Sequence, residues 1–386
     1  MQTASARENI FDTKETIEFS GFGRIVGGYL DDKDLAFQHY QNNLSFTEQS
    51  LLALRVDAHL SDKLKLVTQG ILHTGTIREN EVQWLYLQYQ ASRSLSVRLG
   101  RQRMPFFDFS ETNDVGFAYP WITPPIQVYT DFLFFDIDGI MASYEFSGKD
   151  VSGAIESYFG EFEGELTVAE TSSQTKLNNS RGLILKLNYD SFTFRASHHI
   201  TQVDLGLKPI VEFRDILRSA ELNDAADSIG VEGSIEFSQL SLSYDSFDYF
   251  MKTELTRYDS DFLAFPDVKN GYITLGYNFY PYSLHLTYAN SVEEYDRPDN
   301  LIPVGINSEL DALSFGFDQI LMQLNSDGLE SVTLGLRYDY SDNVAFKTEL
   351  AKLNGDDNAR GLFTENSVSN PGNKANFFQV AVEWVF

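Results

Sequence analysis

The last nine residues, Phe-Gln-Val-Ala-Val-Glu-Trp-Val-Phe (378–386), alternate between two kinds of side chain. Every second position from Phe378 to Phe386 is a large apolar residue, and the positions between them include Gln379 and Glu383. Side chains of a β-strand point to opposite faces in turn. The spacing therefore predicts a strand with one apolar face.

The same period of two recurs along the chain, for example at 52–60, 183–189 and 273–279. These repeats come in pairs, and very short polar connections join the two members of each pair. The short connections are 61–63, 92–94, 147–150, 190–191, 246–248, 281–282 and 341–343. Longer, acid-rich connections separate the pairs, at 31–47, 76–81, 105–133, 161–180, 204–229, 261–270, 295–328 and 355–374. This alternation predicts antiparallel strands that run up and down.

Counting the repeats gives sixteen strands of about 10–14 residues, with both chain ends on the side of the short turns. A tilted strand of this length crosses the hydrocarbon layer of a membrane. Short turns opposite long loops, with Tyr and Phe near the short turns, are typical of outer-membrane barrels, whose closure leaves no unpaired edge. We therefore predict an all-β fold, a transmembrane antiparallel β-barrel in the bacterial outer membrane, with periplasmic turns and extracellular loops. Residues 15–386 form this single barrel, and residues 1–14 form a periplasmic N-terminal extension.

Two of the long connections carry patterns of their own. In the seventh, Leu313, Phe315 and Phe317 fit either a short helix that begins at Ser308 or an extra hairpin, so eighteen strands stay an alternative to sixteen. In the fifth, apolar residues at helical spacing follow Pro209. They predict a short amphipathic helix that folds onto the mouth of the barrel.

The composition excludes several classes of protein. The chain has 386 residues and no cysteine, which rules out disulfide bonds, thiolate metal sites and a cysteine nucleophile. It carries 29 Lys and Arg against 56 Asp and Glu, a formal net charge of −27. Because no basic face is available to neutralise phosphates, nucleic acid is excluded as a partner.

Sixteen strands enclose an interior too wide for side chains to fill, so barrels of this size leave a water-filled channel. The residues predicted to face inward are polar throughout, which a wet lumen explains. Lys252-Thr253-Glu254 and Lys347-Thr348-Glu349 repeat one another, with the Lys and Glu of each copy on the inward face. The inward candidates are Glu18, Ser20, Arg24, Arg55, Asp57, His59, Gln69, Gln88, Arg98, Lys186, Arg195, Lys252, Glu254, Arg337, Lys347, Glu349 and Glu383.

The most distinctive stretch, Arg-Leu-Gly-Arg-Gln-Arg-Met-Pro (98–105), leads into the third long connection. Here the chain resembles the porins of Gram-negative bacteria, in which a strand with basic residues leads into a third loop that folds back and narrows the barrel. The Gly100-Arg101 pair followed by Pro105 looks like the start of that loop in phosphate-selective and related substrate-selective porins. The Pro-Glu-Phe-Gly-Gly motif of the general porins is absent. The resemblance implies that residues 105–133, called the third loop below, form a constriction.

The resemblance also implies charges of opposite sign across this constriction. Such charges across a narrow wet gap set up a transverse field that orients dipolar solutes. The acidic side would be Asp108, Glu111, Asp114 and Asp131 on or beside the third loop. The basic wall would be Arg24, Arg55, Arg98, Arg101 and Arg103.

Further properties follow from the resemblance. The porins assemble as homotrimers, and we expect the same here. Trp384 and Phe386 match the aromatic end that the outer-membrane barrel assembly machinery reads. Membrane lipid and lipopolysaccharide would contact the outside of the barrel. No cofactor is expected other than Ca²⁺ at the acidic outer loops, which have suitable oxygen ligands but no regular calcium-loop spacing.

Catalysis has little support in the sequence. His198 and His199 are adjacent, so on a strand one faces outward and the other inward, and the two cannot hold one ion together. With His285 and neighbouring serines they are the candidates for an outer-membrane hydrolase, but their spacing is nonspecific. We therefore predict that the protein is not an enzyme.

The function predicted is that of a porin that passes small hydrophilic solutes and ions passively. It would prefer cations, because the acidic loops repel anions at the mouth. One alternative is a channel selective for phosphate or carboxylates, in which Arg98, Arg101 and Arg103 bind the anion. An alternative of another class is an outer-membrane barrel enzyme or a surface adhesin.

Overall fold

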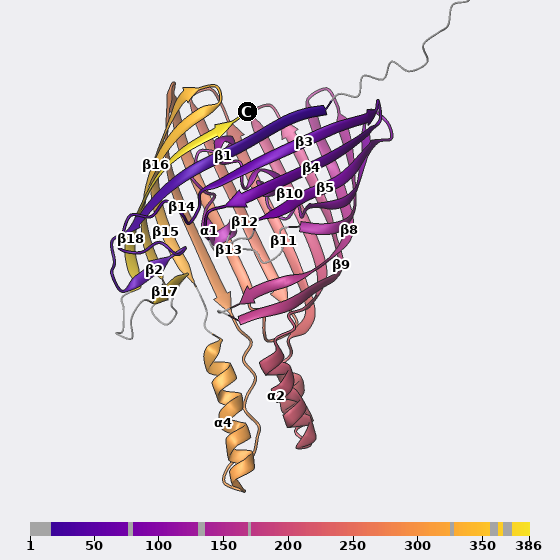
Figure 1. The fold of residues 1–386 in the computed structure, drawn as a ribbon, viewed down its shortest axis with the longest axis vertical. Helices are drawn as coiled ribbons and strands as arrows, with labels where there is room; N and C mark the ends of the chain where they lie inside the picture. Colours follow the sequence, from indigo (N-terminus) through magenta and orange to yellow (C-terminus); the bar gives the residue numbers. More distant parts are fainter. Residues whose placement is uncertain are drawn as a thin grey trace, which may run out of the picture.

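A computed structural model describes residues 17–75, 80–129, 136–168, 171–324, 328–355, 362–365 and 373–386. Sixteen strands close into one antiparallel barrel (Figure 1), in which β1 pairs with β18. The proposed extension, residues 1–14, lies outside the described residues. The barrel strands are β1 (Ile17–Leu30), β3 (Leu51–Ser61), β4 (Leu64–His73), β5 (Glu81–Gln90), β6 (Leu95–Arg103), β7 (Asp136–Ser147), β8 (Val151–Val168), β9 (Thr171–Tyr189), β10 (Phe192–Asp204), β11 (Glu232–Asp245), β12 (Tyr249–Ser260), β13 (Asp267–Phe279), β14 (Tyr282–Glu294), β15 (Leu329–Ser341), β16 (Val344–Gly355) and β18 (Lys374–Val385).

The short connections join neighbouring strands at one end of the barrel, as predicted. One of the two-residue connections, Asp190-Ser191, links β9 to β10, and Asp190 takes a φ of 50°. Asp tolerates this left-handed conformation better than most residues do, which suits it to a two-residue turn. The chain end at Phe386 lies at the same end of the barrel (Figure 1).

The prediction of a long fourth connection at 161–180 is wrong. Strands β8 and β9 continue through most of it and form an extended hairpin beyond the neighbouring strands (Figure 1). Glu163 and Lys176 are paired across this hairpin, and their side chains form an exposed ion pair of 2.8 Å. Above the membrane a strand needs no apolar outer face, so the hydrophobic alternation fades although the pairing continues.

The seventh connection contains helix α4 (Ser308–Gln323), so the barrel has sixteen strands and not eighteen. The helix begins where the Asn307 side chain accepts hydrogen bonds from the backbone N–H groups of Glu309 and Leu310. An Asn at this position satisfies donors that the first turn leaves free. Among the described residues, no helix is long and apolar enough to cross a membrane.

The helix predicted in the fifth connection is confirmed as α2 (Lys208–Ser219), and the shorter α3 (Asn223–Ser228) follows it. Its expected position on the barrel mouth is wrong, because α2 and α4 both project away from the barrel (Figure 1). Leu217 of α2 and Phe317 of α4 are fully buried in one apolar cluster of these helices. Packing against α4 therefore replaces packing against the barrel.

The outside of the barrel, called the outer wall below, is apolar. Leu240, Leu255 and Leu275 are each more than half exposed on it. Near the short turns, Tyr277, Phe279, Tyr282, Tyr338 and Phe346 form a continuous row of ring contacts, with the centroids of Tyr282 and Tyr338 5.1 Å apart. An apolar band with an aromatic girdle is the outer surface of a barrel that spans a membrane. The prediction of a β-barrel that spans a membrane is confirmed.

The inside differs from the prediction of polar residues throughout. Tyr158, Phe237 and Tyr272 of the barrel strands face inward and pack with Phe107 and Trp121 of the third loop in one buried apolar cluster. Strand β11 carries apolar residues on both faces, since Phe237 points inward and Leu240 points outward. Period-two alternation cannot show which apolar face is covered by a loop.

The first and eighth connections meet over part of the mouth. Strands β2 (Leu35–Phe37) and β17 (Phe363–Glu365) pair there as a small separate sheet. Phe37 contacts both Phe363 and Phe377, with ring centroids 5.6 Å and 5.3 Å apart. These contacts hold the two outer loops to the barrel interior.

Candidate functional site

The third loop folds into the barrel, and its described part includes the short helices η1 (Ser110–Thr112), η2 (Gly116–Ala118) and α1 (Ile126–Tyr129). It contacts widely separated strands. Arg98 of β6 binds the Glu111 carboxylate at 2.6 Å, and Ile122 N–H donates to Glu349 of β16 at 2.9 Å. The loop therefore crosses the interior from one wall to another.

Arg195 of β10 holds the beginning of the loop. Its guanidinium donates to the carbonyl oxygens of Pro105 and Phe106, the latter at 2.9 Å, and to the side chain of Gln239. The residue is only 5% exposed. These hydrogen bonds occupy the guanidinium, so Arg195 holds the loop and is not free to bind a solute.

Glu254 of β12 ties two distant parts of the loop together. Its carboxylate accepts a hydrogen bond from Asp108 N–H at 2.9 Å and another from the Tyr129 hydroxyl at 2.5 Å. Gln239 donates a third, at 3.0 Å. Burial, together with the Glu254 charge, raises the pKa of Tyr129 well above its usual range. The tyrosine therefore stays a neutral donor to the carboxylate.

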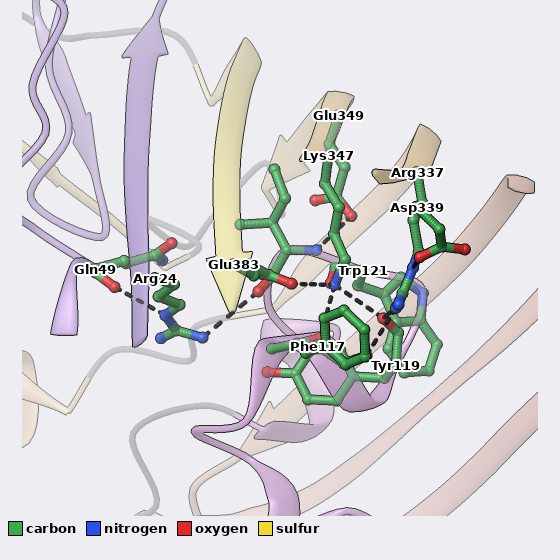
Figure 2. Close-up of polar contacts among 12 residues, drawn as sticks. Arg24, Gln49, Phe117, Tyr119, Trp121, Arg337, Asp339, Lys347, Glu349 and Glu383 are labelled. Atoms are coloured by element: carbon green, nitrogen blue, oxygen red, sulfur yellow. Dashed lines mark hydrogen bonds and ion pairs between the residues drawn. The ribbon is translucent and has the colours of Figure 1, made fainter. Parts of the chain in front are cut away.

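The middle of the loop is held by cations of β15 and β16 (Figure 2). Lys347 Nζ lies 2.6 Å from Glu383 of β18 and donates to the carbonyl oxygens of Gly116 and Tyr119 at 2.7 Å and 2.8 Å. Arg337 donates to the carbonyl oxygens of Phe117 and Tyr119. Charged donors on uncharged carbonyls make hydrogen bonds stronger than neutral ones.

Trp121 adds an apolar anchor beside these polar contacts. Its ring lies edge-on to Tyr272 with centroids 5.4 Å apart, and its indole N–H donates to the hydroxyls of Thr274 and Thr287. The side chain is 1% exposed. A tryptophan buried with its N–H satisfied stabilises a fixed loop position.

A cavity of ≈ 380 Å³ remains between the start of the third loop and the inner faces of β8 to β12. Phe107 and Phe109 form its apolar side. Charges of both signs line the rest, and the Lys252 ammonium also lies 5.7 Å from the Phe109 ring centroid. The charged residues of the cavity are Asp108, Glu111, Glu156, Lys186, Arg195, Asp245 and Lys252.

The predicted acidic residues occupy different places. Asp108 and Glu111 line the cavity. Asp114 is buried and accepts hydrogen bonds from Arg103 and Gln83, both at 3.0 Å, so it holds the loop instead of facing the cavity. Asp131 lies outside the described residues.

The five predicted basic residues do not form one wall. Arg24 is buried and donates to the carbonyl oxygens of Gln49 and Ile122 (Figure 2). Arg55 faces the lumen, where it binds Asp57 at 3.1 Å and lies over the Trp84 ring. These two residues do line the interior, as expected, but only Arg55 keeps part of its side chain exposed.

The Arg98, Arg101 and Arg103 cluster is divided between three environments. Arg98 faces the lumen and binds Glu111, whereas Arg103 is buried in ion pairs with Asp114 and Asp136. Arg101 lies on the outer wall instead of in the lumen, on the same face as the exposed Leu99, and makes two hydrogen bonds to Asp138. The cluster therefore cannot bind one anion in the channel.

Sequence reasoning placed six residues on the inward face but missed their roles at the third loop or at the cavity beside it: Lys186, Arg195, Lys252, Glu254, Lys347 and Glu349. The repeated Lys-Thr-Glu of 252–254 and 347–349 is the signal that could have found some of them. Glu254 and Glu349 each accept a hydrogen bond from a backbone N–H of the third loop. The two copies thus hold the loop from different walls.

No protein-family model and no curated protein sequence matches the chain. Among solved structures, the trimer form of OmpT, an outer membrane protein of Vibrio cholerae, is 11% identical, with 96% of this chain and 99% of that chain covered and a TM-score of 0.57. The outer membrane channel DcaP of Acinetobacter baumannii is also 11% identical, with 97% and 99% covered and a TM-score of 0.56. An anion-selective porin from Comamonas acidovorans is 15% identical, with 97% and 100% covered and a TM-score of 0.55. At these identities the likeness is one of fold: the chain has the sixteen-stranded barrel of bacterial outer-membrane porins.

Proposed function

We propose that the protein is an outer-membrane channel through which small hydrophilic solutes and ions diffuse passively. The observation that carries the proposal is the third loop, which crosses a closed barrel and leaves a cavity of ≈ 380 Å³ lined by charges of both signs. Water and polar solutes are stable in such a space, and the apolar cluster on the loop restricts their size.

Within this proposal the channel prefers cations. The support is the formal net charge of −27, since a surplus of carboxylates raises the local concentration of cations and repels anions. Asp108 and Glu111 at the cavity add to that field, while Lys186 and Lys252 oppose it. The sign of the balance is measurable as a reversal potential.

The interior carries out no covalent chemistry in this proposal. His199 packs against the hydroxyl of Tyr158, and His285 lies 3.4 Å from Glu349, which also holds the third loop. Both histidines are 2% exposed. Their surroundings support a role in holding the interior together, because no serine nucleophile in reach of a solute accompanies them among the described contacts.

We also propose a homotrimer. On the outer wall, Leu52, Leu72 and Val82 keep β3, β4 and β5 apolar close to their extracellular ends, and Ile25 is exposed on the neighbouring β1. Other strands carry charges there, as the exposed Lys269 does on β13. An apolar sector that carries no exposed charges near its extracellular edge is suited to contact with further copies of the chain. One of the similar structures is a trimer form.

Further partners belong to the same proposal. The backbone of Phe386 pairs with Gly21 of β1 at 2.9 Å in both directions, so the aromatic end also closes the barrel. Its recognition with Trp384 by the assembly machinery, and contacts of the outer wall with lipid and lipopolysaccharide, stay predictions. The binding of Ca²⁺ at the acidic loops also stays a prediction, and the described residues contain no group of three potential metal ligands.

The experiment that tests the channel is reconstitution of the purified protein in a planar bilayer under about a tenfold KCl gradient. We expect single-channel steps with a cation-selective reversal potential, and three equal levels for a trimer. An anion-selective potential would contradict the cation preference. The absence of any conductance from correctly folded protein would overturn the channel itself.

A further inference from the structure

A second group of chemically active side chains lies on the outer wall, away from the channel. His198 of β10 and Ser238 of β11 are register partners, and His198 Nδ1 lies 3.0 Å from Ser238 Oγ. The other ring nitrogen, Nε2, lies 4.0 Å from the carboxylate of Glu236. Glu236 stands two residues before Ser238, so both side chains point to the same face. The imidazole thus lies between a hydroxyl and a carboxylate.

The group faces outward, because the adjacent His199 is the residue that points into the barrel. The side chains of His198 and Glu236 are 52% and 57% exposed. Leu240 and Leu255, both exposed on the outer wall, lie on the side of the group toward the membrane centre. The group therefore stands at the extracellular edge of the apolar band.

Two cations continue the same row across the sheet. Arg257 of β12 is the register partner of Ser238, and Lys269 of β13 is the register partner of Arg257. Their charges are shared with Asp259 and Glu294, and both side chains are more than half exposed. A lipid whose acyl chains lay along Leu240 and Leu255 would bring its ester groups to Ser238 and its phosphate to this row.

We propose that Ser238, His198 and Glu236 form a hydrolytic site for acyl esters of a phosphorylated lipid in the outer leaflet. Ser238 is the nucleophile and His198 the general base, while Glu236 is a positioning residue that orients the imidazole. A serine, an imidazole and a carboxylate in this order are what acyl transfer requires. The site is separate from the channel, since it lies on the other face of the barrel wall.

The reaction uses water as its only co-reactant. Ser238 Oγ forms a bond to the ester carbonyl carbon, and its proton passes to His198 Nδ1. The bond to the lipid alcohol then breaks, and that alcohol leaves with the proton. A water molecule, deprotonated by the same nitrogen, releases the fatty acid and returns the proton to Ser238. The Glu236 carboxylate, 4.0 Å from Nε2, stabilises the positive charge of the protonated imidazole. Arg257, the register partner of Ser238, stabilises the negative charge that develops on the ester oxygen.

The test uses the full chain in phosphatidylglycerol vesicles that contain a fluorescent acyl chain. We expect release of fluorescent fatty acid and covalent labelling of Ser238 by a fluorophosphonate, located by peptide mass spectrometry. Ser238→Ala should abolish both. Ser234→Ala, a change on the same strand and face without a histidine partner, should alter neither. His198→Gln should lower the rate about a hundredfold, the usual contribution of a general base.

The role of Glu236 is tested by a measurement that a loss of protein stability alone would not change. Glu236→Gln should lower kcat with little change in KM, and Glu236→Asp should recover part of kcat. Failure of the wild-type protein to release fatty acid, or equal labelling of the Ser238→Ala variant, would overturn the proposal. The conductance of Ser238→Ala should equal that of the wild type, so the hydrolytic site and the channel are tested separately.

Discussion

Lys347 and Glu383 face each other inside the barrel, with Nζ 2.6 Å from the carboxylate and each side chain 1% exposed. They belong to adjacent strands of the wall, β16 and β18. Lys347 also donates to the carbonyl oxygens of Gly116 and Tyr119 in the third loop (Figure 2). A buried ion pair is stable only when its remaining donors and acceptors are satisfied. Here carbonyl oxygens of the third loop accept the remaining hydrogen bonds of Lys347.

Replacing Lys347 with Met should both destabilise the barrel and release the loop. Loss of one partner leaves Glu383 buried without its cation, which costs about 3–5 kcal/mol in the free energy of unfolding. We expect a lower unfolding midpoint in urea and a larger single-channel conductance. Lys352→Met, a change on the exposed side of the same strand, is the matched control. An unchanged conductance in Lys347→Met would contradict the anchoring role of this lysine.

Replacement of Arg98 should change ion selectivity and replacement of Arg101 should not, although both residues have the same predicted role. Arg98→Ala removes a cation from the lumen and frees Glu111, so we expect cation selectivity to rise by about twofold. Arg101→Ala removes a charge from the outer wall, where it pairs with Asp138, so the reversal potential should not move. Reversal potentials in a KCl gradient compare the two. A shift of equal size in both variants would contradict their placement.

The barrel could be predicted from sequence because its physical cause is local. The alternation in 378–386 requires a strand, and a two-residue connection such as Asp190-Ser191 fixes the register of the next one. The helix at 208–219 followed from its own spacing. The extension of β8 and β9 could not be predicted in this way, because beyond the membrane a strand needs no apolar face and the alternation is lost.

The contacts of the third loop could not be predicted from sequence, because they join residues far apart in the chain. Nothing near Glu254 indicates that it binds both Asp108 and Tyr129, and nothing near Lys347 points to residues 116–121. The predicted place of Arg101 came from the resemblance, although Arg101 lies three residues after the inward Arg98 and so points to the other face of the strand. The position of Arg103 was missed for a local reason. Arg101 and Arg103 share a strand parity, yet the end of β6 turns Arg103 inward to Asp114. A period-two rule fails where a strand ends.

Charge changes at the cavity should shift ion selectivity in opposite directions. Asp108→Asn removes an acidic group and should lower the ratio of cation to anion permeability by about twofold, whereas Lys186→Gln should raise it by a similar factor. Both residues line the cavity. Lys63→Gln, in a short turn outside the lumen, is the control. If Asp108→Asn and Lys186→Gln both leave the reversal potential unchanged, ions do not pass through this cavity.

The helices beyond the barrel should be separable from the channel. Phe317 of α4 is fully buried in the cluster that α4 forms with α2 and α3, and Gly316 lets Phe213 of α2 approach closely, since a Cβ there would lie 3.0 Å from its ring. Phe317→Ala should lose about 3–5 kcal/mol of packing within this cluster. We expect faster proteolytic cleavage in 205–231 and 295–324, with unchanged unfolding of the barrel and unchanged conductance. Phe315→Ala, an exposed residue of the same helix, should leave cleavage at the wild-type rate. A loss of conductance in Phe317→Ala would show instead that the projecting helices are coupled to the third loop.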